Sequence, residues 1–66
     1  MKNWVKLERA RIDITQQQLA DALKVSVQTI NSIEKYRFYP SLIITLKISE
    51  YFKKPVNEIF VLEEGD

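Results

Sequence analysis

Two short helical segments follow one another between residues 15 and 34, and their spacing limits the possible folds more than any other feature. Thr15 and Gln18 have the spacing of a capping box, in which each side chain bonds the backbone N–H of the other. An apolar face follows at helical spacing and consists of Leu19, Ala20 and Leu23. Lys24 and Val25 then interrupt the pattern, and Ser26 supplies the next N-cap. The sequence therefore predicts helices over residues 15–23 and 26–34.

The second of these helices has a polar face of uncommon composition. Its apolar stripe consists of Val27, Ile30 and Ile33. Its opposite face consists of Gln28, Thr29, Asn31 and Ser32. Solvated helix faces usually carry Lys and Glu, which form helices better than these residues do. Short polar side chains read base edges in the DNA major groove, and a helix-turn-helix unit places its second helix there. The pair of helices therefore predicts DNA binding.

The rest of the chain predicts three more helices around this pair. Asn3 is available as the N-cap of a first helix that ends near Asp13. Ser41 caps a fourth helix, and a short fifth helix follows Pro55. Val61-Leu62 is expected to pair with the start of the chain as a small ribbon of two strands. We therefore expect an all-α fold, a compact five-helix bundle that forms a single domain over residues 1–66.

Two residue types are absent, and their absence limits the classes of function that the protein can have. The 66 residues include no cysteine and no histidine. This excludes a disulfide framework, a thiolate zinc site and the commonest general base. We therefore expect neither an enzyme nor a metal or cofactor site. No stretch approaches the roughly 20 apolar residues of a membrane span, and we expect a cytoplasmic protein with no membrane contact.

Charge is distributed unevenly along the chain. Residues 1–54 hold all ten basic side chains and five acidic ones, for a net charge of +5, whereas residues 55–66 hold four acidic side chains and no base. A basic body suits a polyanionic partner, and an acidic tail would limit non-specific attraction. Many small proteins have lopsided charge without this meaning, so the distribution alone does not decide between the two interpretations.

At these residues the chain resembles the phage-repressor or XRE-type helix-turn-helix proteins. The matching stretches are Ile14–Ala20, Val25–Glu34, Pro40–Leu42, Leu46–Ile48 and Asn57–Phe60, so that the resemblance covers about residues 4–60. It implies a lambda-repressor-like DNA-binding domain and a homodimer on a palindromic operator. We therefore expect a sequence-specific transcriptional regulator that represses, with double-stranded DNA and a second copy of itself as partners.

The resemblance also implies roles for individual residues. Positions that face bases or nearby phosphates in the family correspond to Val27, Gln28, Thr29, Asn31 and Ser32. Positions that touch backbone phosphates correspond to Thr15, Gln16, Lys35 and Arg37. The family also commonly pairs the position of Arg9 with an acid at the position of Glu34, which implies a structural ion pair.

The sequence departs from the family at its turns. The usual glycine between the two helices is Lys24 here, so a residue with a side chain must take the turn conformation. After the second helix, Lys35-Tyr36 replaces the usual Asn-Gly, and the bulky Tyr36 argues against a left-handed turn. Phe38 and Tyr39 follow in the same loop. They pack on DNA sugar and phosphate or cover the core, and the sequence favours the second.

The carboxyl-terminal half contains more apolar residues than the buried face of a helix needs. This excess indicates a surface for a partner. A twofold dimer is the simplest use of that surface, and we place the dimerisation region near residues 43–62. Its expected interface residues are Ile44, Ile59, Phe60 and Leu62. The alternative is a protein-interaction module of the same fold, such as an antitoxin-like partner of another chain. Because the chain has no room for an effector domain, we expect regulation to come from the protein level, from a second regulatory protein as a further partner, or from competition at the operator.

Overall fold

Three helices begin at the serine and threonine residues that the sequence marks as N-caps. The computed structural model describes residues 1–66 and contains α2 (Gln16–Leu23), α3 (Val27–Glu34) and α4 (Leu42–Phe52). Thr15 Oγ1 accepts a hydrogen bond from Gln18 N at 3.0 Å, and Gln18 Oε1 accepts one from Thr15 N at 2.8 Å. Ser26 and Ser41 cap α3 and α4 in the same way with their hydroxyl oxygens. The predicted capping box and both serine caps are therefore confirmed.

The N-cap of the first helix, α1 (Val5–Arg11), is Trp4 and not the predicted Asn3, whose side chain nevertheless bonds the first N–H of the helix. Asn3 Oδ1 accepts a hydrogen bond from Val5 N at 3.1 Å, and Asn3 Nδ2 donates to the carbonyl oxygen of Ile33 at 2.9 Å. Only 7% of Asn3 is exposed. This one side chain therefore ties the start of α1 to the last turn of α3. The helix ends at Arg11, two residues earlier than its sequence predicts.

Four helices end in the same kind of turn, and none of these turns contains glycine. The left-handed residues are Asp13, Lys24, Tyr36 and Lys53, with φ between 55° and 61°. After each of them, the next N–H bonds a carbonyl oxygen five residues back, as Val25 N does to Ala20 O at 3.0 Å. The left-handed conformation expected at Lys24 is thus present. The prediction that Tyr36 avoids it is wrong, because the bonds that close the end of α3 require this conformation whatever the side chain.

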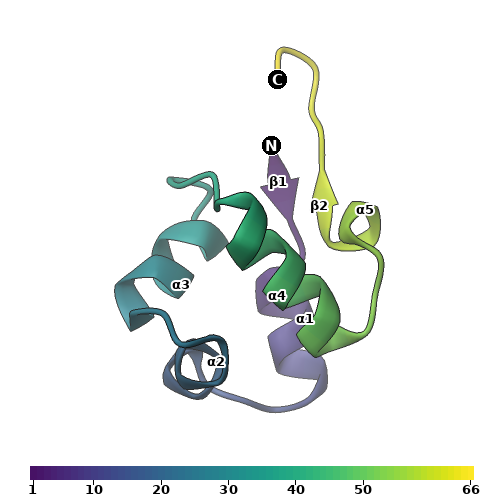
Figure 1. Cartoon of the computed structure of the whole chain (residues 1–66). Helices are drawn as coiled ribbons and strands as arrows, with labels where there is room; N and C mark the ends of the chain where they lie inside the picture. The colour runs from purple at the N-terminus through teal and green to yellow at the C-terminus, as the bar shows by residue number, and fades with distance from the viewer.

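The two ends of the chain meet in a short antiparallel ribbon, drawn as two arrows in Figure 1. α5 (Val56–Ile59) leads directly into β2 (Phe60–Val61), which pairs with β1 (Lys2–Asn3). Lys2 lies opposite Val61 and Asn3 opposite Phe60, one residue earlier than predicted for the second strand. The register follows from the adjacent bond from Trp4 N to the carbonyl oxygen of Ile59, at 2.8 Å.

Beyond the ribbon, the last residues fold back onto the first. The Met1 amino group lies 2.7 Å from Asp66 Oδ2 and 3.3 Å from Glu63 Oε1. The hydroxyl of Tyr39 donates to Asp66 Oδ1 at 3.3 Å. This terminal clasp (Met1, Tyr39, Glu63 and Asp66) raises the pKa of the Met1 amine to about 10, chiefly through the hydrogen bond with Asp66. The same bond lowers the pKa of Asp66.

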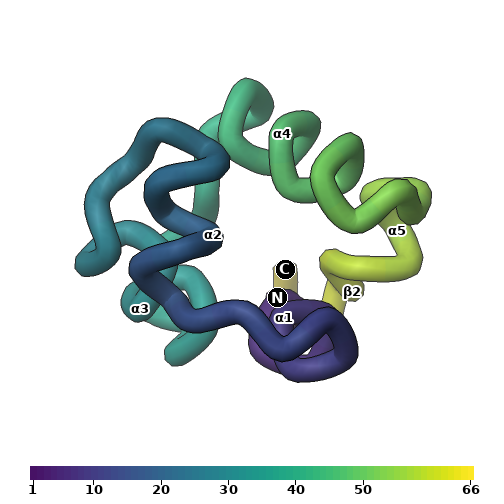
Figure 2. The backbone as a smooth tube through the Cα atoms, turned by 90° about the horizontal axis from the view of Figure 1, so that it is seen from below, coloured from purple at the N-terminus to yellow at the C-terminus, as the bar shows by residue number.

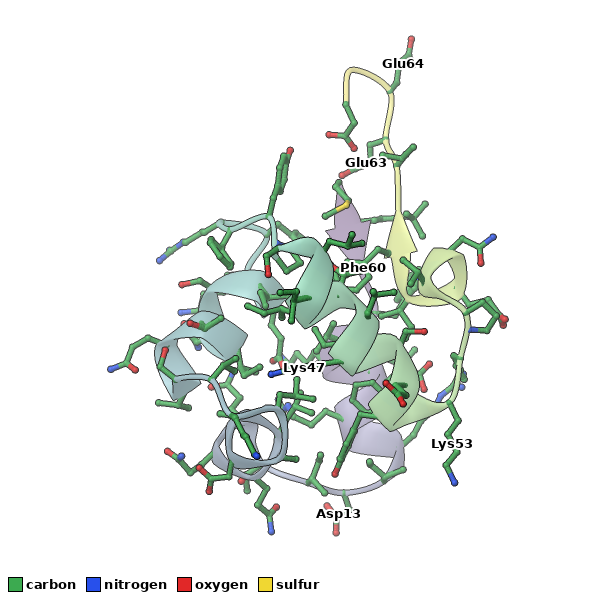
Figure 3. The ribbon with its side chains drawn as sticks, in the orientation of Figure 1. Asp13, Lys47, Lys53, Phe60, Glu63 and Glu64 are labelled. Carbon is green, nitrogen blue, oxygen red and sulfur yellow. The ribbon has the colours of Figure 1, made fainter.

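The core is built by every helix and by the ribbon. Figure 2 shows the helices arranged in a ring, and core side chains fill its interior. The buried apolar residues are Val5, Leu19, Ala20, Leu23, Ile30, Ile33, Ile48, Ile59 and Phe60. Lys47, labelled in Figure 3, reaches across from α4 to donate to the carbonyl oxygen of Leu23 at 3.1 Å. None of the helices combines the length and the apolar character that crossing a membrane requires.

Two residues predicted at a dimer interface belong to this core instead. Ile59 is fully buried and Phe60 is 7% exposed, because α5 and β2 turn them inward against the other helices. Ile44 is partly buried and also packs against the core. Of the four expected interface residues, Leu62 alone is freely available, with 78% exposure. The exposed large hydrophobic side chains of α4 are Leu42, Ile43, Leu46 and Tyr51.

Candidate nucleic-acid interface

The outer face of α3 is held outward by the burial of its inner face. Ile30 and Ile33 are fully buried, and α3 makes its most extensive contact with α2. This leaves Gln28 exposed at the centre of two shallow grooves. One groove is lined by Gln16, Val27, Gln28, Asn31 and Ser32. The other is lined by Gln28, Thr29, Ser32, Arg37 and Phe38. All five predicted base-reading residues therefore lie on one continuous surface.

These five residues differ in how free their side chains are. The side chain of Gln28 makes no hydrogen bond within the chain, so both the oxygen and the nitrogen of its amide are free. The hydroxyl of Thr29 lies 2.8 Å from that of Ser26 and already has a partner there. Val27 packs partly against the core. The free amide of Gln28 is therefore the group best placed to meet a ligand.

A buried ion pair joins α1 to the end of α3. Arg9 Nε lies 2.9 Å from Glu34 Oε2, and Arg9 Nη2 donates to Glu34 Oε1 at 3.1 Å. The third bond of the guanidinium goes to the carbonyl oxygen of Ile14, at 2.8 Å. The side chain of Glu34 is 3% exposed and that of Arg9 is 17% exposed. The hydrogen bonds with Glu34 raise the pKa of Arg9, so the guanidinium stays charged.

The same carboxylate also positions a side chain of the interface. Gln16 Nε2 donates to Glu34 Oε1 at 3.1 Å, and Gln16 Oε1 accepts a longer bond, 3.4 Å, from Asn31 Nδ2. The side chain of Gln16 thus bridges the ion pair to the polar face of α3. Asn31 keeps its carbonyl oxygen and one amide hydrogen for a ligand. This chain of bonds could not be predicted from the sequence, because Gln16 and Asn31 lie 15 positions apart and no local pattern links them.

The basic side chains expected at phosphates lie at the edges of this surface. Lys35 and Arg37 are exposed directly after α3. Thr15 is exposed at the start of α2, where its hydroxyl oxygen serves the capping box. In the first turn of α2, the backbone N–H groups of Gln16 and Gln17 make no bond within the chain. A helix N-terminus with free N–H groups favours an anion.

Several acidic side chains lie far from this surface or are paired with basic groups. Figure 3 shows Glu63 and Glu64 at the pole farthest from α2. A second buried carboxylate, Glu8, is 6% exposed and lies 2.8 Å from Lys54 Nζ. Its burial is unexpected from the sequence, since one glutamate on a short helix looks like any surface residue. No three His, Cys, Asp or Glu side chains gather closely enough to hold a metal ion.

Comparison with known proteins gives the same family throughout. The helix-turn-helix family model matches residues 5–59. An uncharacterized HTH-type transcriptional regulator of Methanocaldococcus jannaschii is 42% identical over 66 residues, which cover both chains completely. Another, from Bacillus subtilis, is 42% identical over 64 residues and 97% of each chain. A third, from Archaeoglobus fulgidus, is 34% identical over the whole of this chain and 93% of its own.

The fold, the exposed face of α3 and these matches together define a helix-turn-helix protein. The chain belongs to the XRE-type helix-turn-helix family. It is a DNA-binding regulator of transcription, not an enzyme.

Proposed function

We propose that the protein is a sequence-specific repressor that binds a palindromic operator as a homodimer. The observation that carries this proposal is the outer face of α3, where Gln28 presents an unbonded amide and Asn31 is oriented by Gln16. Glutamine and asparagine amides bond adenine at N6 and N7 in the major groove. Each half-site would accordingly contain adenine at the positions that these two side chains meet.

Contacts to the DNA backbone come from both sides of α3. On one side, the start of α2 offers the hydroxyl of Thr15, the amide of Gln16 and two free backbone N–H groups. On the other side, Lys35 and Arg37 offer charge. Such contacts fix the position of the protein on the duplex without reading sequence. They also make affinity fall steeply as salt is added.

A second copy of the chain accounts for the exposed apolar face of α4. Leu42, Ile43 and Leu46 are 72%, 67% and 50% exposed, an unusual apolar surface for so small a protein. Half-sites read from successive major grooves are about 34 Å apart. One copy measures 32 × 22 × 20 Å, so two copies side by side span that distance and meet between the half-sites.

Selection of binding sites from a random duplex pool at physiological salt tests the proposal directly. An inverted repeat among the selected sequences is the expected result, and its spacing gives the dimer geometry. Gln28→Ala should relax the preference at one position per half-site, by about 1–3 kcal/mol. Lys35→Ala should instead weaken all sequences about equally and lower the salt slope by roughly one. A folded wild-type protein that selects no common sequence would refute DNA reading and favour the interaction-module alternative.

The dimer surface is tested by sedimentation of two matched variants. Ile43→Glu places a charge on the outer face of α4 and should shift the protein toward monomer. Ile12→Glu is the control, because Ile12 is 50% exposed and lies outside α4, after the end of α1. An unchanged dimer in the Ile43 variant would exclude this face of α4 as the interface.

A further inference from the structure

Phe38 is an exposed aromatic residue at the edge of the base-reading surface. It is 42% exposed and does not belong to the apolar residues that pack against the core. An exposure of this size leaves a large part of the ring available to a ligand. Its neighbours in the second groove are Gln28, Thr29, Ser32 and Arg37, which are polar or charged. A phenyl ring in such surroundings gains little from the folded monomer itself.

The end of α3 determines where this ring lies. Tyr36 takes the left-handed conformation, with φ 61°, and Arg37 N donates to the carbonyl oxygen of Ser32 at 3.0 Å. This bond turns the chain back along α3, so that the next residue lines a groove with the outward side chains of the helix. Phe38 is thus held beside Gln28 by the backbone and by no packing of its own ring against the core.

We infer that Phe38 reads a thymine through its C5 methyl group, an inference that rests on the proposed binding of DNA by α3. Phenylalanine is one of the side chains that contact this methyl group in the major groove. Any adenine bonded by Gln28 is paired with a thymine, and neighbouring pairs present further methyl groups in the same groove. The ring therefore adds an apolar contact to a surface that otherwise reads bases through hydrogen bonds. It makes Phe38 a specificity-determining residue.

Replacement of thymine by uracil tests this inference, because it removes the methyl group and leaves base pairing unchanged. Each thymine of one half-site in the selected operator is replaced in turn, and the dissociation constant is measured for the wild-type protein and for Phe38→Ala. For the wild type, one position should weaken binding about three- to five-fold, the effect of one buried methyl group. Phe38→Ala should bind the thymine operator more weakly than the wild type by the same factor. Replacement of that thymine by uracil should weaken the binding of Phe38→Ala no further.

Two variants of the same loop serve as controls. Phe38→Leu keeps an apolar side chain and should retain part of the uracil effect. Tyr39→Ala removes the neighbouring aromatic ring, which is 65% exposed and bonds Asp66 outside the groove, and should retain the full effect. Phe38→Ala should keep the melting temperature of the wild type, since its ring is not part of the core.

Several results would overturn the inference while leaving the proposed function intact. One is a uracil effect of the same size in Phe38→Ala, which would place the ring on the DNA backbone. Another is the absence of any uracil-sensitive position, and a third is a loss of dimer in Phe38→Ala, which would place the ring between two protein chains. If the wild-type protein selects no DNA sequence at all, the proposed function fails and this inference fails with it.

Discussion

Removal of Arg9 should cost more stability than any exposed substitution in this chain. In Arg9→Met, Glu34 loses both bonds from the guanidinium, and the carbonyl oxygen of Ile14 loses its side-chain donor. The carboxylate then remains 3% exposed with Gln16 Nε2 as its one remaining side-chain donor. Breaking a buried pair on one side costs about 3–5 kcal/mol. Since 17% of the Arg9 side chain is exposed and water reaches the pair, we expect the lower value, about 3 kcal/mol.

A loss of this size is large for a domain of 66 residues. At about 0.05–0.15 kcal/mol per residue, the total free energy of unfolding is about 3–10 kcal/mol. In a domain of this size each kcal/mol corresponds to about 4–8 °C of melting temperature, so the variant should melt about 12–24 °C lower. Urea and thermal unfolding, followed by far-ultraviolet circular dichroism, measure both quantities.

A second substitution separates the buried charge from the lost packing. Glu34→Gln in the Arg9→Met background removes the unpaired charge and keeps the shape of the side chain. The double variant should therefore be more stable than Arg9→Met alone. A loss below about 1 kcal/mol for Arg9→Met, as in surface pairs, would refute the reasoning. So would a double variant less stable than the single one.

Two further predictions concern a helix end and the terminal clasp. Lys53→Gly should raise the free energy of unfolding by about 0.5–1 kcal/mol, because φ at Lys53 is 56° and its exposed side chain makes no bond. Lys53→Ala keeps Cβ and should show no such gain when both variants are unfolded in urea. The raised pKa of the Met1 amine implies that the clasp stabilises the fold fully below pH 8 and that this contribution is lost as the pH rises toward about 10. The lowered pKa of Asp66 implies a second loss below its ordinary value of 3.8, and Asp66→Asn should flatten both slopes of stability against pH. Equal slopes in the two proteins would show that the clasp does not form in solution.

Features with a local cause could be predicted from the sequence. The helices after Thr15, Ser26 and Ser41 begin as expected, because an N-cap and the helix it caps lie within a few residues of each other. The left-handed turn at Lys24 is expected as well, because the family that the chain resembles usually has glycine at that position. The outward face of α3 follows from the same helical periodicity, with Ile30 turned inward.

Features that depend on distant parts of the chain could not be predicted. Asn3 bonds Ile33, 30 positions away, and this contact is visible only once α1 and α3 are packed together. Ile59 and Phe60 looked available for a partner because no pattern in a four-residue helix indicates which side faces inward. The size of Tyr36 argues against a left-handed conformation, whereas the hydrogen bonds that close α3 decide the conformation of this residue.

Hydrogen bonding divides the candidate interface into a fixed part and an exchangeable part. Gln16 is bonded to Glu34 and Asn31, so that a substitution there disturbs the ion pair beneath it. Gln28 has no partner within the chain, and any side chain compatible with an exposed helix position can replace it without loss of stability. Under the proposed mode of binding, single substitutions at position 28 would change the target sequence while the scaffold tolerates each of them.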